Sequence, residues 1–398
     1  MRTTTDNNSL TVYLEGRIDT NNAAAVEKEL FEAVDTNPAD AIVIDTESLE
    51  YISSAGLRVL MKLRKSTTKP MTMINVSRDI YEIFETTGFT QLLDVKKALR
   101  KISVEGCELI GAGGYGKVYR LDPETIVKIY NPGISLSFVE QERATSQKAF
   151  LSGVPTAISY DVVKCGDSYG VVYELLNART TAQLLSADPS VLPEVFGKSA
   201  GLLKKLHTIV PGKDSGLPDR KEKMITWVNS ISEYITEEEA EKIKNFIRSI
   251  PDRDTFLHGD YNAKNIMVQD DEFLLIDIGD AAIGHPVFDV AGLMLAYLIL
   301  PASRGGSRSD ADLQGLLGFP FEYAQKVWGV MCATYFGTTS QDEIGAITQK
   351  LMPYCLLLMT YHSLNVPGND PAAMKIRIDK VLREKLLPSI ENVQPLDF

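Results

Sequence analysis

Cysteine is scarce in this chain of 398 residues. The four thiols lie far apart, with no C-x-x-C pair and no histidine cluster beside them: Cys107, Cys165, Cys332 and Cys355. A disulfide framework or a structural zinc site needs thiols at short, paired spacings. Neither is expected here, and a reduced, cytoplasmic protein is the simplest interpretation.

The chain also lacks an excess of positive charge and any long apolar run. Its formal net charge is −12, so it offers no general basic surface to nucleic acid or to an anionic membrane. The first residues contain no apolar stretch typical of a signal peptide. The longest apolar run, residues 290–300, is shorter than the roughly 20 residues that cross a bilayer. We therefore expect neither nucleic acid nor a membrane as a partner.

The first hundred residues alternate between two patterns. Strand patterns cover 9–16, 40–46 and 70–77, and amphipathic helix patterns cover 21–34, 53–66 and 78–88. Asn21 or Asn22 is expected to cap the first helix, Ser53 or Ser54 the second, and Gly88 to end the third. This alternation predicts an α/β domain with a small sheet covered by helices. Beyond Asp289 the pattern is mostly helical, with a loop expected over 303–310.

A glycine-rich stretch, GAGGYGKV, follows this first domain and contains Gly111, Gly113, Gly114 and Gly116. In a dinucleotide-binding fold such glycines stand between a strand and a helix. Here residues 117–130 carry a strand pattern interrupted by a turn at 122–123, so no helix can follow directly. We expect a hairpin over the phosphates of a nucleotide, where glycines let backbone amides approach phosphate oxygens.

A lysine and a glutamate follow the glycines in the order that phosphoryl transfer requires. Lys128 lies on the next strand, in TIVKIY, where it can reach back to the α- and β-phosphates. Glu142 begins a helix pattern and could hold that lysine in place by an ion pair. Glu140, two residues earlier and therefore on another helix face, is the alternative.

The stretch HGDYNAKNIM, residues 258–267, has the character of a catalytic loop. Asp260 could accept the proton of an acceptor hydroxyl, and Asn265 could offer a neutral oxygen to Mg²⁺. An apolar strand then delivers Asp277 as the second metal ligand. Each residue alone has an ordinary structural explanation, but the ordered set favours a kinase-like site.

The spacing after Asp277 restricts the acceptor. Asp289 is only twelve residues further on, which leaves no room for the long activation segment that docks peptides in protein kinases. Gly259 stands where a protein kinase has the arginine that clamps a phosphorylated loop. Both features favour a small hydroxylated molecule as acceptor, and the sequence does not identify it.

The first hundred residues, through IDTESLEYISSAGLRVLMKL and IFETTGFTQLLDV, resemble the STAS domain of anti-sigma factor antagonists. The resemblance implies a regulatory role, a protein partner, and phosphorylation of a serine at the start of the second helix, which falls on Ser54. A phosphate there would be favoured by the helix N-terminus. The alternative is that Ser53 or Ser54 only caps the helix.

From about residue 105 onward, HGDYNAKN, IDIGDA and IGHPVFDVA resemble the aminoglycoside phosphotransferase and choline kinase family, which has a protein-kinase-like fold. The resemblance implies a β-rich lobe over 101–178, a helical lobe over 179–398, and a STAS-like domain boundary at residue 100. It also implies ATP, or less often GTP, in the cleft, with Mg²⁺ on Asn265 and Asp277. Backbone groups near Glu174 and Leu176 would hold the adenine, although that stretch could equally be only a buried strand.

Two other functions remain open at this point. The chain could be a signalling module whose STAS half binds a protein while the kinase-like half senses nucleotide without turnover. The intact set of base and metal ligands argues against a pure sensor. Alternatively the kinase-like half could phosphorylate Ser54, which the missing activation segment argues against.

Overall fold

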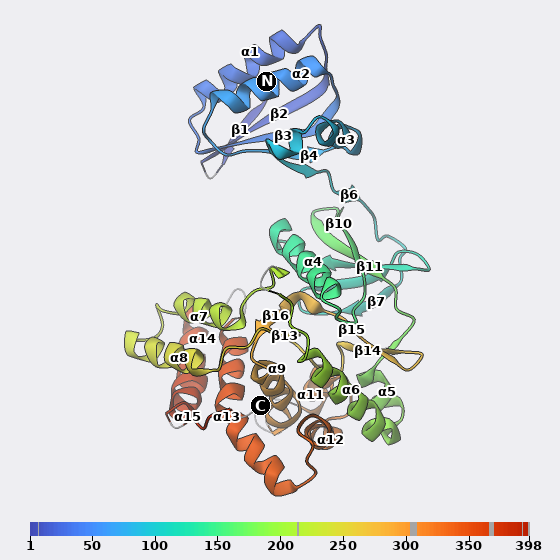
Figure 1. Cartoon of the computed structure of the whole chain (residues 1–398), viewed down its shortest axis with the longest axis vertical. Helices are drawn as coiled ribbons and strands as arrows, with labels where there is room; N and C mark the ends of the chain where they lie inside the picture. The colour runs from blue at the N-terminus through green and yellow to red at the C-terminus, as the bar shows by residue number, and fades with distance from the viewer. Residues whose placement is uncertain (7, 213–214, 303–308, 366–369, 392, 397–398) are drawn as a thin grey trace. The chain divides into compact units, whose positions relative to one another are not determined.

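The computed structural model describes residues 1–398 except 7, 213–214, 303–308, 366–369, 392 and 397–398. Most of the loop expected at 303–310 lies outside the described residues. The chain divides into two compact units, Met1–Ile102 and Ser103–Phe398, shown in Figure 1 from blue to red along the sequence. Among the described residues, no helix combines the length and apolarity that a bilayer crossing requires.

The first unit is built on a sheet with the strand order β1-β2-β3-β4-β5. Its strands are β1 Thr3–Asp6, β2 Ser9–Ile18, β3 Ala41–Ile52, β4 Met71–Val76 and β5 Asp94–Lys97, followed by the short β6 Arg100–Lys101. β1 is antiparallel to β2, and the other neighbours are parallel. The helices are α1 Ala23–Thr36, α2 Ser54–Ser66 and α3 Arg78–Thr86. The predicted α/β architecture of this region is confirmed.

Alternating apolar residues of β2 and β3 make the core of the first unit. Leu10, Val12, Ile42 and Ile44 are at most 1% exposed, and α1 and α2 lie side by side against these strands (Figure 1). A period of two places every second side chain on the covered face, which is why these residues form a half-buried sheet. The packing of α2 against this sheet therefore fixes where Ser53 and Ser54, at the start of the helix, are presented.

The helix ends of this unit differ partly from expectation. Ser53 caps α2, because its Oγ accepts hydrogen bonds from the N–H groups of Ala55 and Gly56. Asn22 does not cap α1 with its side chain. Its Oδ1 instead accepts from the Asp19 N–H at 2.8 Å, which ties the turn before the helix.

The second unit opens with an antiparallel sheet in the order β10-β11-β9-β8-β7. The strands are β7 Leu109–Ala112, β8 Gly116–Arg120, β9 Thr125–Tyr130, β10 Ser159–Cys165 and β11 Ser168–Glu174. The helix α4, Leu136–Leu151, packs on β10 and β11. Ser135 begins α4 by accepting the Phe138 N–H at 3.3 Å. This sheet carries the glycine hairpin and the strand lysine.

The rest of the second unit is mostly helical. Short strands occur in two groups, β12 Arg179–Thr180 with β14 Ile266–Gln269 and β15 Glu272–Leu275, and β13 Thr255–Leu257 with β16 Ala282–Gly284. The helices are α5 Thr181–Ala187, α6 Leu192–Leu206, α7 Arg220–Ser230, α8 Glu237–Ser249, α9 Val287–Met294, α10 Leu300–Ala302, α11 Asp310–Leu317, α12 Ala324–Phe336, α13 Gln341–Leu364, α14 Pro371–Arg377 and α15 Leu387–Ser389.

One large apolar core joins these helices. It includes Phe196 of α6, Phe256 of β13, Met294 of α9 and Leu357 of α13, each at most 1% exposed. The strands β13, β14 and β15 pass over this core, and their connecting loops carry the polar residues singled out by the sequence. A rigid apolar base therefore fixes loops that have no regular structure of their own.

Candidate active site

The glycine loop is the turn of the β7–β8 hairpin, and one of its glycines is required by packing. A Cβ on Gly116 would lie 2.1 Å from the carbonyl oxygen of Ile129, so no larger residue fits between β8 and β9. The Gly113 N–H donates to the Gly116 carbonyl at 2.9 Å and closes the turn. Around Gly113 and Gly114 there is open space, which leaves room for a ligand. The structure thus places the predicted loop on a hairpin, and Gly111 lies opposite Val118 within it.

Lys128 joins two carboxylates that are far apart in the sequence. Its Nζ lies 2.7 Å from Glu142 Oε1 on α4 and 2.8 Å from Asp277 Oδ1 after β15. Burial alone would lower the pKa of Lys128, but the charges of Asp277 and Glu142 outweigh it and hold that pKa above its ordinary value. The lysine therefore remains charged. Glu140, the alternative partner, lies exposed on α4.

The catalytic loop is held by Asp289, which the sequence analysis used to measure spacing and as part of IGHPVFDVA, without giving it a role. Asp289, 3% exposed on α9, accepts the N–H groups of His258 and Gly259, both at 2.8 Å. Its Oδ2 also lies 3.2 Å from His207 Nε2. Because these bonds fix the backbone just before Asp260, Asp289 orients the loop. The sequence signal for Asp289 was its position, a charged residue in an apolar helix pattern twelve residues after Asp277.

Gly259 has a conformational reason to be glycine. Its φ is +85°, and a Cβ there would lie 2.3 Å from the carbonyl oxygen of Asp280. The left-handed backbone and the close approach both exclude other residues. As a result the segment around Asp280 packs directly against the loop that presents Asp260.

Asp260 and Asn265 form one hydrogen-bonded unit. The Asn265 Nδ2 donates to Asp260 Oδ2 and to the Asp260 carbonyl, each at 2.9 Å. Asn262 Nδ2 donates to the other carboxylate oxygen at 3.0 Å. Desolvation by the surrounding protein raises the pKa of Asp260, and the nearby charge of Asp277 acts in the same direction. Asp260 as a whole residue is exposed, so a ligand can reach it.

Asp277 lies next to Asn265 because of the β14–β15 hairpin. The Ile276 N–H donates to the Asn265 carbonyl at 3.0 Å, and Asp277 follows with a left-handed φ of +59°. The amide nitrogen of Asn265 is committed to Asp260, so its Oδ1 is the atom left to face a cation. In the described part of the chain, no three residues of the His, Cys, Asp and Glu types group into a metal site. A carboxylate with a carboxamide oxygen suits Mg²⁺ whose other ligands are phosphate oxygens and water.

Glu174 and Leu176, the predicted adenine-binding stretch, lie where β11 ends. They line an open pocket of about 460 Å³ together with Thr156, Gln269, Asp270, Glu272 and Leu274. The Glu174 N–H is already bonded to the Ile158 carbonyl at 2.9 Å, and its carboxylate accepts the Ile158 N–H at 3.2 Å. The Glu174 N–H and one oxygen of the Glu174 carboxylate are therefore both bonded to Ile158.

In the first unit, Ser53 and Ser54 have different surroundings. Ser53 is half-buried and caps α2, whereas Ser54 is the first residue of the helix and is exposed. The capping explanation therefore applies to Ser53 and leaves the Ser54 hydroxyl accessible.

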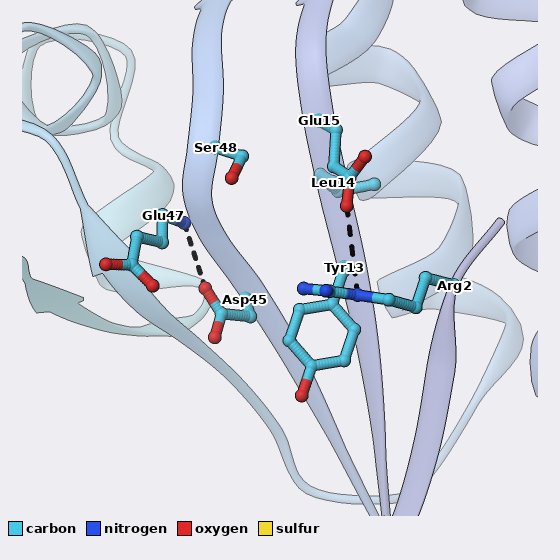
Figure 2. A pocket seen from close by; sticks show the side chains of 7 residues that line it. All are labelled: Arg2, Tyr13, Leu14, Glu15, Asp45, Glu47 and Ser48. Carbon is cyan, nitrogen blue, oxygen red and sulfur yellow. Dashed lines mark hydrogen bonds and ion pairs between the residues drawn. The ribbon is translucent and has the colours of Figure 1, made fainter.

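A small notch also opens on the strands of the first unit. Figure 2 shows Arg2 lying over the Tyr13 ring, 3.8 Å from its centroid, beside Glu15 and Asp45. The notch holds about 20 Å³, which is room for one water molecule. It is too small for an organic ligand.

Comparisons with known proteins agree with this organisation. Residues 106–325 match the phosphotransferase enzyme family, and residues 1–102 match the STAS domain. The curated anti-sigma factor antagonist BtrV of Bordetella bronchiseptica is 33% identical over 89 residues, which are 22% of this chain and 76% of that protein.

The solved structures that align with this chain have low sequence identity. A choline/ethanolamine kinase family protein from Mesorhizobium loti is 16% identical and aligns over 71% of this chain and 92% of its own, with a TM-score of 0.43. ADP-bound aminoglycoside phosphotransferase APH(2'')-Ib is 16% identical over 78% and 98% of the two chains, with a TM-score of 0.45. Amicoumacin kinase hAmiN is 11% identical over 79% and 96%, with a TM-score of 0.45. The chain therefore belongs to the phosphotransferase enzyme family through residues 106–325, and residues 1–102 are a STAS domain.

Proposed function

We propose that the second unit transfers the terminal phosphoryl group of ATP to a hydroxyl of a small molecule, in a reaction that requires Mg²⁺. The observation that carries the proposal is the contact of Lys128 with both Glu142 and Asp277. This contact joins the sheet, α4 and the end of β15 into one charged centre beside Asp260. Such a lysine, an anchoring glutamate and a metal-type aspartate are the fixed parts of a kinase site.

Each residue has a role in this proposal. The glycines of the hairpin and Lys128 hold the phosphates, and Glu142 positions Lys128. Asn265 and Asp277 would hold Mg²⁺, which neutralises charge on the phosphates. Backbone groups near Glu174 and Leu176 are proposed to contact the adenine.

The chemical step is an in-line displacement. Asp260 accepts the proton of the acceptor hydroxyl while the hydroxyl oxygen forms a bond to the terminal phosphorus. The bond from that phosphorus to the bridging oxygen breaks, and ADP leaves with the electron pair. Asn262 and Asn265 keep the Asp260 carboxylate turned toward the acceptor, since each donates to one of its oxygens.

The segment after Asp277 supports a small acceptor. Its residues form a single short helical turn, Ile278–Asp280, and then β16, which pairs with β13. The pairing returns the chain to the core at once. No peptide-docking segment can be accommodated between Asp277 and α9.

The test is ADP formation with Mg²⁺ and ATP across a panel of amino alcohols, aminoglycosides, sugars and hydroxy acids. We expect one class to stimulate turnover and Asp260→Asn to lower kcat by about 10²-fold or more, the range for loss of a positioned base. Asp271→Asn is the matched control, because Asp271 is exposed in a turn with φ +67°, which asparagine tolerates. Full turnover by Asp260→Asn would remove Asp260 from the mechanism.

We further propose that the STAS domain binds a protein partner and that Ser54 is its phosphorylation site. The exposure of Ser54 at the start of α2, with the cap supplied by Ser53, favours this second function. Mass spectrometry after incubation with Mg²⁺ and ATP, comparing wild type with Ser54→Ala, tests whether the chain phosphorylates itself there. Absence of phosphate on Ser54 in an enzyme that turns over an acceptor would exclude self-phosphorylation.

A further inference from the structure

A buried arginine beside the proposed active site has no hydrogen-bonded or ion-paired partner among the described residues. Arg220, the first residue of α7, is 2% exposed, and its Nε has no hydrogen-bond partner. Among the described residues, no ion pair or hydrogen bond to its guanidinium occurs. Two aromatic rings lie near it, Phe288 at 5.8 Å and Tyr361 at 5.6 Å from centroid to Cζ. An isolated buried charge is costly, so a residue of this kind calls for an explanation.

The position of α7 brings this arginine next to the catalytic loop. Lys223, one helical turn after Arg220, donates to Asp280 Oδ1 at 2.8 Å. Asp280 in turn abuts the loop, since a Cβ on Gly259 would lie 3.0 Å from the Asp280 Cβ. Asp260 is the next residue. Arg220 therefore lies near the loop that presents Asp260, in a wall of side chains with Lys223, Asp280 and His362. The charge of Asp280 also reaches Tyr115 of the glycine hairpin.

The charges at this wall do not balance. Asp280 is one carboxylate, and it already pairs with Lys223. Although desolvation would raise the pKa of Asp280, the charges of Lys223 and Arg220 lower it, so it stays ionised. Desolvation and the charge of Arg220 lower the pKa of His362, which keeps this neighbouring ring neutral near pH 7. Among Arg220, Lys223, Asp280 and His362 the positive charges therefore exceed the negative ones by one, and the Asp260 carboxylate lies next to this group.

We propose that Arg220 binds an oxyanion, a carboxylate or a phosphate group, carried by the acceptor. This inference rests on the proposed function and names the substrate class, which is an anionic hydroxylated small molecule. A guanidinium suits this role because its planar N–H groups bind both oxygens of a carboxylate or phosphate at once. Asp280 and His362 are exposed and lie close enough to Arg220 for its charge to lower their pKa values, and the rings of Phe288 and Tyr361 form part of the guanidinium's apolar surroundings.

The alternative is that Arg220 only fills space between the two rings. The two explanations predict opposite effects of Arg220→Met, which keeps the length of the side chain and removes the charge. If Arg220 awaits an anion, the variant melts at the same temperature as wild type or higher, because an unpaired buried charge has been removed. If Arg220 is a structural residue, the variant melts at a lower temperature or does not fold, and the proposal is overturned.

The binding test uses inorganic sulfate and inorganic phosphate as probes. The full chain is first saturated with Mg²⁺ and a non-hydrolysable ATP analogue, so that the glycine hairpin and Lys128 are occupied. Calorimetry should then detect a saturable anion site in wild type and in Arg248→Met, an exposed arginine on α8. We expect Arg220→Met to weaken this site by about tenfold or more, the worth of a charge-assisted hydrogen bond. Equal affinity in wild type and Arg220→Met would overturn the proposal.

Matched acceptors distinguish the source of the anion and separate this inference from the proposed function. Glycerate and glycerol 3-phosphate are each compared with glycerol as competitors of the bound sulfate, with no turnover required. Displacement by either anion and not by glycerol is expected, and displacement by glycerol alone would contradict the proposal. An enzyme that binds these anions through Arg220 but never releases ADP with any acceptor would disprove the phosphotransferase activity and leave the anion site intact.

Discussion

At the scale of single residues, the sequence predicted which polar side chains come together but not which residues hold them in place. Lys128, Glu142, Asp260, Asn265 and Asp277 were selected by type and order, and the structure brings them together. Ordered motifs are visible in a sequence because each member must have one chemical type. Asp289 stands within the IGHPVFDVA stretch, but its role could not be predicted, since a buried acceptor for two backbone amides is defined only by the three-dimensional position of those amides.

The burial of Arg220 also could not be predicted from the sequence. In the sequence it is one arginine in a polar helix start, DRKEK, where exposure is the ordinary expectation. Only the packing of α7 against β16 and α13 buries it between two rings. Its functional interpretation could therefore arise only from the structure.

Asp289 leads to a stability prediction. Asp289→Asn keeps the volume but offers one acceptor oxygen to groups that now use two, so we expect the free energy of unfolding to fall by about 1–3 kcal/mol. Urea unfolding at neutral pH measures this change. An unchanged midpoint would show that Asp289 does not hold the catalytic loop.

The same residue predicts a pH dependence. Burial would raise the pKa of Asp289, but the hydrogen bond and charge of His207 outweigh it and lower that pKa below its ordinary value. A lowered folded-state pKa gives stability that is fully present above the unfolded pKa of about 3.9 and is lost as the pH falls through the folded pKa. The loss of stability on acidification below about pH 4 should be smaller in Asp289→Asn than in wild type. Identical acid profiles would contradict this account.

At the scale of elements, the glycine hairpin separates two kinds of glycine. A Cβ at Gly116 would collide with the Ile129 backbone, whereas one at Gly113 would meet nothing within 4 Å. We expect Gly116→Ala to lower the free energy of unfolding by about 1–3 kcal/mol, and Gly113→Ala to change it by less than about 1 kcal/mol. Denaturant unfolding of the two variants decides the matter. Equal losses in both would mean that the hairpin packing is not the cause.

The helix α2 allows a second matched comparison. Ser53→Ala removes the cap and should cost about 1 kcal/mol, while Ser54→Ala should leave the free energy of unfolding nearly unchanged. Unfolding of the first unit measures both. A larger loss for Ser54→Ala would make Ser54 the structural residue and weaken its proposed phosphorylation.

The main elements of the first hundred residues were predicted, and the short edge strands were not. Periods of two and of 3.6 residues identified β2, β3, β4 and the three helices because one face of each is buried. The strands β1 and β5 are mostly exposed and gave no such pattern. Asn22 stands at the expected N-cap position of α1, but its side chain makes no capping hydrogen bond and binds in the preceding turn, and both uses look alike in sequence. The sequence offered both Ser53 and Ser54 as the cap of α2. Only the structure separates them, because Ser53 has an extended backbone at the N-cap position and Ser54 is already helical.

At the scale of the whole molecule, each unit has its own apolar core. The core of the first unit consists of residues from 10 to 93, and the core of the helical region is made of residues from 149 to 386. The sequence changes from alternating strand and helix patterns to a glycine-rich hairpin pattern near residue 111, so the presence of a second domain could be predicted. The contents of each core followed from apolar patterning, whereas the burial of polar groups such as His258 and Asp289 did not.

Separate cores predict independent folding. Residues 1–102, expressed alone, should unfold in one cooperative transition monitored by circular dichroism, because their core is complete within that range. A fragment without a cooperative transition would show that this unit depends on the remainder of the chain.

The central claim is that the second unit moves a phosphoryl group from ATP to the hydroxyl of a small molecule. Phosphorus NMR of reaction mixtures with Mg²⁺, ATP and the acceptor panel tests it most directly, because it detects the new phosphate ester itself. We predict an ester resonance for one acceptor class with wild type and with Asp271→Asn, and its loss with Asp260→Asn. Release of inorganic phosphate alone from nucleotide-bound wild type, with no ester from any acceptor class, would contradict the account.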